Sequence, residues 1–127
     1  MNRLIVKVKE IKHLDRINLI KFDLNSQIIN VLILEMNVDL QKNKKASLLI
    51  KPTAITIVKN PIDFENILKG KIIEMERGDI LARISVDVEG FEMEVIMLNE
   101  KLNVKINDEV YLVFKASDVI ISRVLND

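Results

Sequence analysis

The stretch that decides the fold is ILARISVDVEGFEMEVIML, residues 80–98. Apolar residues mostly alternate with polar ones as far as Val88, and the alternation resumes at Phe91 after the pair Glu89-Gly90. A period of two places successive side chains on opposite faces of a β-strand, and a short interruption with glycine between two such runs is typical of a hairpin turn. Residues 79–98 are therefore predicted to form a β-hairpin with one buried face.

The chain repeats itself at an offset of 64 residues, in one register without a gap from Asn2/Asn66 to Lys51/Lys115. The apolar positions in between mostly match as well, and chance identities alone would not produce that shared pattern. Further identical pairs are Leu4/Leu68, Lys7/Lys71, Glu10/Glu74, Asp15/Asp79, Asp23/Asp87, Val31/Val95, Leu34/Leu98, Asn43/Asn107, Leu48/Leu112 and Ile57/Ile121. A linker around Pro61 then separates two predicted modules, residues 1–60 and 61–127.

Each module is expected to contain five short strands. In the second they surround the hairpin, at 67–76, 109–115 and 118–124, and a short helical turn is expected within 99–104. The first-module strands are expected near 3–12, 15–24, 27–35, 46–51 and 54–59. Five strands within about sixty residues predict a small barrel of the oligonucleotide-binding (OB) type. The expected fold is all-β, with two tandem five-stranded OB-like barrels and a short helical turn in each.

The composition excludes several classes of function. Lysine plus arginine and aspartate plus glutamate both number 19, so no net charge attracts the chain to nucleic acid or to an anionic membrane. Cysteine is absent, which excludes disulfides and thiolate sites. The N-terminal residues contain frequent lysines and no long apolar run, so neither a signal peptide nor a membrane span is expected, and the predicted location is the cytoplasm.

Two sequence motifs indicate a family. Residues 109–121, EVYLVFKASDVII, run from an apolar strand through Lys-Ala-Ser into another strand, and residues 48–57, LLIKPTAITI, form the first-module counterpart. Residues 66–72, NILKGKI, precede them as an opening motif. Together these motifs resemble the TOBE, or molybdenum-pterin-binding (Mop), domain, and the tandem arrangement resembles the molbindins. The resemblance implies a cytoplasmic protein that binds molybdate or tungstate and forms a symmetric homo-oligomer with ligand between subunits or modules.

Molybdate and tungstate are tetrahedral dianions, so their site must offer hydrogen-bond donors. In the second module Lys115 offers a charge, Ala116 a backbone N–H and Ser117 a hydroxyl, and a turn is able to direct successive N–H groups at one anion. These three residues are the predicted oxyanion site of that module. The spacing of these residues does not choose between molybdate, tungstate and sulfate.

The first module offers a similar but poorer donor set. Lys51 and Thr53 are the counterparts of Lys115 and Ser117, while Pro52 has no N–H to donate. Asn2 and Asn66 are also predicted site residues, either positioning the anion through the backbone or capping a strand. We expect the two sites to differ.

One departure from the family is expected to oppose anion binding. The family motif before the first strand is Ser-Ala-Arg-Asn, whereas this chain has Asp63-Phe64-Glu65-Asn66. Two donors are thus replaced by carboxylates, whose repulsion of an anion at about 4 Å amounts to several kcal/mol near a protein surface. Either the lysine loops compensate, or the acidic side chains point away from the site.

The resemblance is compatible with three functions. The first is oxyanion binding for storage, buffering or delivery. The others are the effector-sensing domain of a molybdate-responsive regulator and a TOBE-like interaction module that has lost anion binding. The regulator would need a separate DNA-binding region, because no helix-turn-helix pattern precedes Asn2. Binding of single-stranded nucleic acid is disfavoured by an aromatic content of 4%. With no phosphate-loop, nucleophile or metal-ligand motif, we expect no catalysis, no metal site and no organic cofactor.

Overall fold

The computed structural model describes residues 1–35 and 39–125, and in these ranges the protein is all-β, as predicted. The first half contributes β1 (Asn2–Leu14), β2 (Ile17–Leu24), β3 (Gln27–Ile33), β4 (Lys45–Ile50) and β5 (Thr56–Val58). The second half contributes β6 (Asn66–Arg77), β7 (Leu81–Val88), β8 (Phe91–Leu98), β9 (Glu109–Phe114) and β10 (Val119–Leu125). The predicted hairpin is β7 and β8, which pair antiparallel from Leu81 with Leu98 to Val88 with Phe91.

The helical turns agree with the prediction in the second module, and two more are present than the sequence indicated. A 3₁₀ turn, η2 (Asn99–Lys101), lies inside the expected segment, while its first-module counterpart falls on positions that include 36–38, outside the described residues. The two further turns are η1 (Pro52–Ala54) and η3 (Ala116–Asp118). A turn was expected after Lys115, but the helical form of η1 and η3 was not predicted. Each is closed by one backbone hydrogen bond, from Ala54 N to the Lys51 carbonyl and from Asp118 N to the Lys115 carbonyl. A single turn of this length is too short to show helical periodicity in the sequence.

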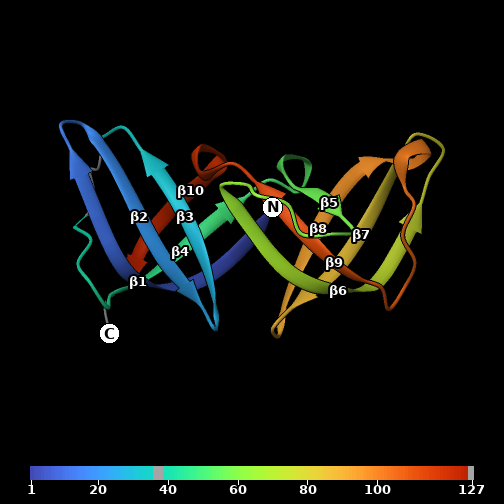
Figure 1. Cartoon of the computed structure of the whole chain (residues 1–127), viewed down its shortest axis with the longest axis horizontal. Coiled ribbons are helices and arrows are strands. Elements are labelled where there is room, and N and C mark those ends of the chain that lie inside the picture. Colours follow the sequence, from blue (N-terminus) through green and yellow to red (C-terminus); the bar gives the residue numbers. More distant parts are fainter. Residues whose placement is uncertain (36–38, 126–127) are drawn as a thin grey trace.

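The two halves of the chain exchange their fifth strands. The first sheet has the order β10-β4-β1-β2-β3 and the second the order β5-β9-β6-β7-β8 (Figure 1). Hence β10, at the end of the chain, pairs with β4, and β5 pairs with β9. We call the β1–β4 sheet with β10 the first module and the β6–β9 sheet with β5 the second module. The boundaries 1–60 and 61–127 remain a prediction about the repeated sequence units.

Strand pairings in one sheet recur in the other. Lys7 pairs with Asp23 and Lys71 with Asp87, positions that differ by 64 in both members. The register shifts after Val8 and again after Ile72, its equivalent. Such a bulge bends a strand, and it allows β1 to pair with β4 along its first part and with β2 along the rest. Each sheet therefore curls into a partly closed barrel whose edge strands, β3 and β10 or β8 and β5, approach each other.

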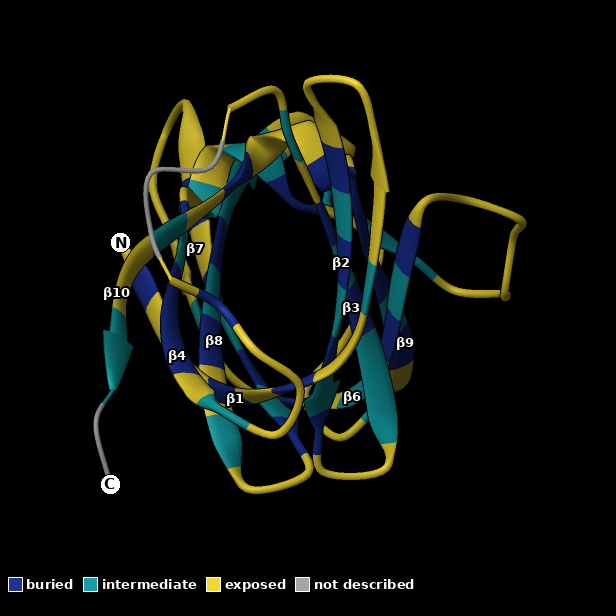
Figure 2. Cartoon of the chain, turned by 90° about the vertical axis from the view of Figure 1, so that its left-hand side faces the viewer, coloured by how far each residue is buried: buried dark blue, intermediate teal, exposed yellow. Residues whose placement is uncertain are grey.

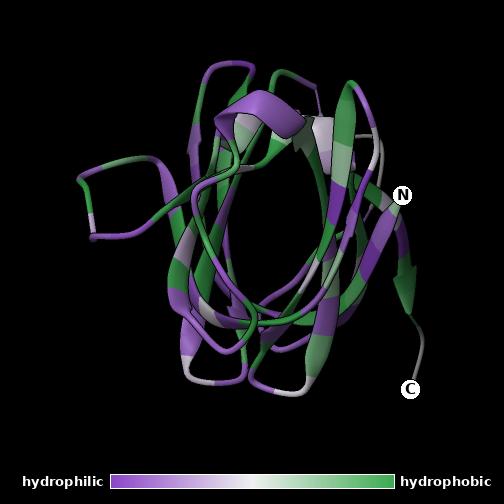
Figure 3. Cartoon of the chain, turned by 90° about the vertical axis from the view of Figure 1, so that its right-hand side faces the viewer, coloured by the Kyte–Doolittle hydropathy of each residue, from purple (hydrophilic) through white to green (hydrophobic). Residues whose placement is uncertain are grey.

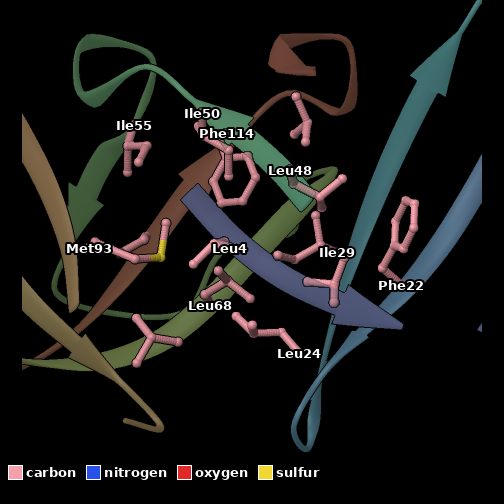
Figure 4. Close-up of a cluster of buried hydrophobic side chains, with 14 of the residues drawn as sticks. Leu4, Phe22, Leu24, Ile29, Leu48, Ile50, Ile55, Leu68, Met93 and Phe114 are labelled. Carbon is pink, nitrogen blue, oxygen red and sulfur yellow. The ribbon is translucent and has the colours of Figure 1, made fainter. Parts of the chain in front are cut away.

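One apolar core runs through both modules. Buried and exposed positions alternate along β1 and β2, so one face of each strand points inward. Figure 2 shows the buried segments along the strands, with the exposed residues concentrated in the loops, and Figure 3 shows the matching hydropathy from the opposite side. In Figure 4, Leu4 lies near Leu68, Met93 and Phe114, which belong to the other half of the chain. Neither half contains this core by itself.

In residues 1–35 and 39–125, no helix has the length and hydropathy that crossing a membrane requires.

The strand exchange predicts that residues 1–60 do not fold alone. Without β10 the edge of β4 is unpaired, and without β9 the short β5 has no partner. We expect the fragment to be unfolded or aggregated by far-UV circular dichroism, and an equimolar mixture with residues 61–127 to recover β structure. A cooperative unfolding transition from the isolated fragment would contradict the prediction.

Candidate functional site

Both predicted lysine loops lie where the chain crosses between modules. Lys51, Pro52 and Thr53 connect β4 of the first module to β5 of the second. Lys115, Ala116 and Ser117 connect β9 of the second module to β10 of the first. We call these segments, 51–53 and 115–117, the crossover loops. Since η1 packs against β8 and η3 against β3, each loop lies on the third strand of the module opposite to the one it leaves.

The donors in the two crossover loops are unequal. Lys51, Thr53, Lys115 and Ser117 are all exposed, so their charges and hydroxyls are accessible from solvent. Ala116 is buried, with 5% of its surface exposed, and keeps a backbone N–H that Pro52 lacks. Each loop therefore presents a lysine and a hydroxyl, and only the second adds a donor at its central residue.

The asparagines Asn2 and Asn66 are buried and join the two modules. The side-chain amide of Asn66 donates to the Asn30 carbonyl at 2.8 Å and accepts from Asn30 N at 2.6 Å. The Asn2 amide does the same at Glu94, with distances of 2.8 and 2.7 Å. Each side chain thus imitates a strand neighbour, satisfying one N–H and one carbonyl on the edge of β3 or β8. The side chains bind backbone here, which makes them positioning residues next to the crossover loops.

Glu65 does not point away from the second crossover loop. Its Oε1 accepts a hydrogen bond from Ala116 N at 2.7 Å, so the carboxylate occupies a donor predicted for the oxyanion. The backbone of Glu65 is held as well, because its carbonyl accepts from Asn30 Nδ2 at 2.9 Å. The expectation that the Glu65 side chain points away from the site is therefore wrong.

Two residues near this loop were not predicted. Asn30 contacts both Glu65 and Asn66, and Lys21 Nζ donates to Asn30 Oδ1 at 2.8 Å. Lys21 lies on β2 and Asn30 on β3, so both belong to the first module, and β3 is the strand that packs against η3. In the sequence, Asn30 stands out only as the single polar residue in the otherwise apolar run 28–34.

No group of three histidine, cysteine, aspartate or glutamate side chains in the described ranges is arranged to hold a metal ion. His13, the single histidine, has Nδ1 2.9 Å from Asn18 Oδ1.

The architecture and the loops define a class of protein: a pair of OB-like barrels that exchange a strand and carry equivalent lysine loops at both crossovers. The family model of the TOBE domain matches residues 63–121, so this segment is similar to a TOBE domain. That match continues to Ile121, in a strand that pairs within the other sheet.

Among solved structures, the chain is similar to the cytoplasmic molybdate-binding protein ModG, whose crystal structure has molybdate bound. The TM-score is 0.87 at 19% sequence identity, and the alignment covers 96% of this chain and 95% of that chain. This likeness shows that the chain has the same fold, and the resemblance to TOBE domains is confirmed. A sequence comparison with curated proteins found no significant match.

The Asn66 contacts predict a cost in stability. Asn66→Ala leaves the Asn30 N–H and carbonyl without their partners at the module junction, and the expected loss of unfolding free energy is about 2 kcal/mol. Urea denaturation measures it, with the exposed Asn103→Ala as a matched control that should stay within about 0.5 kcal/mol of the parent. Equal losses in both variants would show that the junction does not depend on this amide.

Proposed function

We propose that this protein binds molybdate or tungstate at its crossover loops and performs no chemistry on the ion. The proposal is carried by one observation: two loops with the same lysine and hydroxyl pattern occupy equivalent crossovers and each packs on the opposite module. The fold supports the proposal, because it matches that of a molybdate-binding protein over nearly the whole of both chains.

The chemistry of the loops suits a tetrahedral oxyanion. Lys115 and Ser117 supply a positive charge and a hydroxyl, and Lys51 and Thr53 supply the same pair at the other crossover. A compact ammonium group satisfies an anion as a point charge, while a hydroxyl donates one directed hydrogen bond. Asn2 and Asn66 contribute by holding the strands that lie beside the loops.

The proposed role is storage, buffering or delivery of the oxyanion in the cytoplasm, without an organic cofactor. A net charge of zero and an aromatic content of 4% disfavour nucleic acid as the partner.

We further propose that the protein forms a homo-oligomer. Residues 28–34 are apolar at every position except Asn30. Ile29 and Val31 are buried, whereas Leu32 and Leu34 are 38% and 67% exposed. Leu14 and Ile80 are more exposed still, at 71% and 73%. Association of copies would remove such surfaces from water, which is favourable by about 25 cal/mol per Å² of apolar area.

One observation favours a second candidate, an interaction module that has lost anion binding. The Glu65 carboxylate already satisfies Ala116 N, so the second crossover loop has an internal anion. Under this alternative the exposed apolar surfaces would serve a protein partner.

Calorimetric titration with molybdate, tungstate and sulfate distinguishes the candidates. We expect Kd values of about 1 µM or below for molybdate and tungstate. Lys51→Ala and Lys115→Ala should each weaken binding at the altered loop by roughly tenfold to a hundredfold, because each removes a charge-assisted hydrogen bond. The exposed Lys101→Ala removes the same charge outside the crossover loops and should leave the affinities unchanged. Absence of binding by any of the three anions would favour the interaction module.

A further inference from the structure

The hydrogen bond between Glu65 and Ala116 joins two residues that are 51 positions apart and belong to different segments of the site. Ala116 is buried, and its backbone N–H donates to Oε1 of the Glu65 carboxylate at 2.7 Å. A charged acceptor makes a stronger hydrogen bond to an N–H group than a neutral one does. The second crossover loop is therefore bound by an anion that is part of the chain.

Glu65 is held in place from its backbone. The Asn30 side chain donates to the Glu65 carbonyl at 2.9 Å, and the next residue, Asn66, is hydrogen-bonded to Asn30 at both ends of its amide. Lys21 in turn donates to Asn30 Oδ1. This network keeps the start of β6 beside η3 and so keeps the carboxylate within reach of the loop.

The first crossover loop lacks both members of this pair. The repeat places Pro52 at the position of Ala116, and proline has no N–H to offer. It places Met1 at the position of Glu65, and methionine has no carboxylate. The carboxylate Glu94, on the edge of β8 next to this loop, has Oε2 3.5 Å from Arg83 Nε. The second crossover loop thus has both the backbone N–H donor and the carboxylate that accepts from it, and the first crossover loop has neither.

We propose that Glu65 is an internal competitor of the oxyanion at the second crossover loop, an inference that rests on the proposed function. A carboxylate and a tetrahedral oxyanion are both anionic acceptors, and a single N–H cannot serve both while their charges repel at contact distance. An oxyanion therefore binds the Lys115–Ser117 loop only when the Glu65 side chain leaves it. The first crossover loop has no such competitor and fills at lower concentration.

The expected effect follows from the fraction of molecules in which the loop is free. Apparent affinity is the intrinsic affinity reduced by that fraction. If the carboxylate occupies Ala116 N in roughly 90–99% of molecules, removing it raises the affinity of this loop tenfold to a hundredfold.

The test compares molybdate binding to the full-length protein, Glu65→Ala and Asp63→Ala. Asp63 is an exposed carboxylate two residues away, so its removal changes the net charge equally without freeing Ala116 N. Calorimetry should show an affinity gain of about tenfold or more at one site in Glu65→Ala and a smaller gain in Asp63→Ala, which reduces the charge repulsion but leaves Ala116 N bonded to Glu65. Glu65→Gln keeps an oxygen acceptor without the charge, should give an intermediate gain, and serves as the second variant if Glu65→Ala does not fold.

Amide NMR reports on the loop directly. The ¹⁵N–¹H resonance of Ala116 should move in Glu65→Ala and move again on addition of molybdate. Equal gains in Glu65→Ala and Asp63→Ala, or an Ala116 resonance unaffected by molybdate, would overturn the competitor while leaving the proposed function intact. Binding by Glu65→Ala but not by the parent would support the competitor and reject oxyanion binding for the native protein. If no variant binds molybdate, both proposals fail.

Discussion

The reciprocal exchange of β5 and β10 is the constraint on which the other features of this protein depend. Each sheet needs a strand from the opposite half of the chain, so neither barrel is complete until both have formed. Completing the sheets also merges their interiors, since one apolar cluster contains residues of both modules. This sharing suits a chain whose halves are each too small to bury a large core. The exchange creates two crossovers, and the candidate site is located at those crossovers.

The junction between the modules combines symmetry with difference. Asn2 and Asn66 make equivalent amide-to-backbone contacts on β8 and β3, which follows from the repeat. Elsewhere the equivalence is broken: Ala116 and Glu65 are hydrogen-bonded in one module, where the other has Pro52 and Met1. A duplicated scaffold allows such differences because the strands carry the fold, whereas the loop residues are free to change their donors and charges.

Much of the architecture was predictable from periodicity. The hairpin of β7 and β8, the number of strands and the OB-like class all follow from alternating apolar residues, which report which side of a strand is buried. The helical form of η1 and η3 was missed because three residues are too few to show a helical period. The contact of Glu65 with Ala116 was missed because charge suggested repulsion, whereas the carboxylate meets a backbone donor that composition does not reveal.

The sequence by itself determined the all-β class, the 64-residue repeat and the family motifs around Lys51 and Lys115, because these depend on local patterns and on residue identity. Only the tertiary structure decided which strands share a sheet, since β5 and β10 have the same alternation whether they close their own barrel or the other one. It also decided that Glu65 meets Ala116, and that Asn30, itself hydrogen-bonded to Lys21, holds the Glu65 carbonyl. Hydrogen bonds between residues distant in the chain depend on how the strands are placed, and no local pattern encodes that placement.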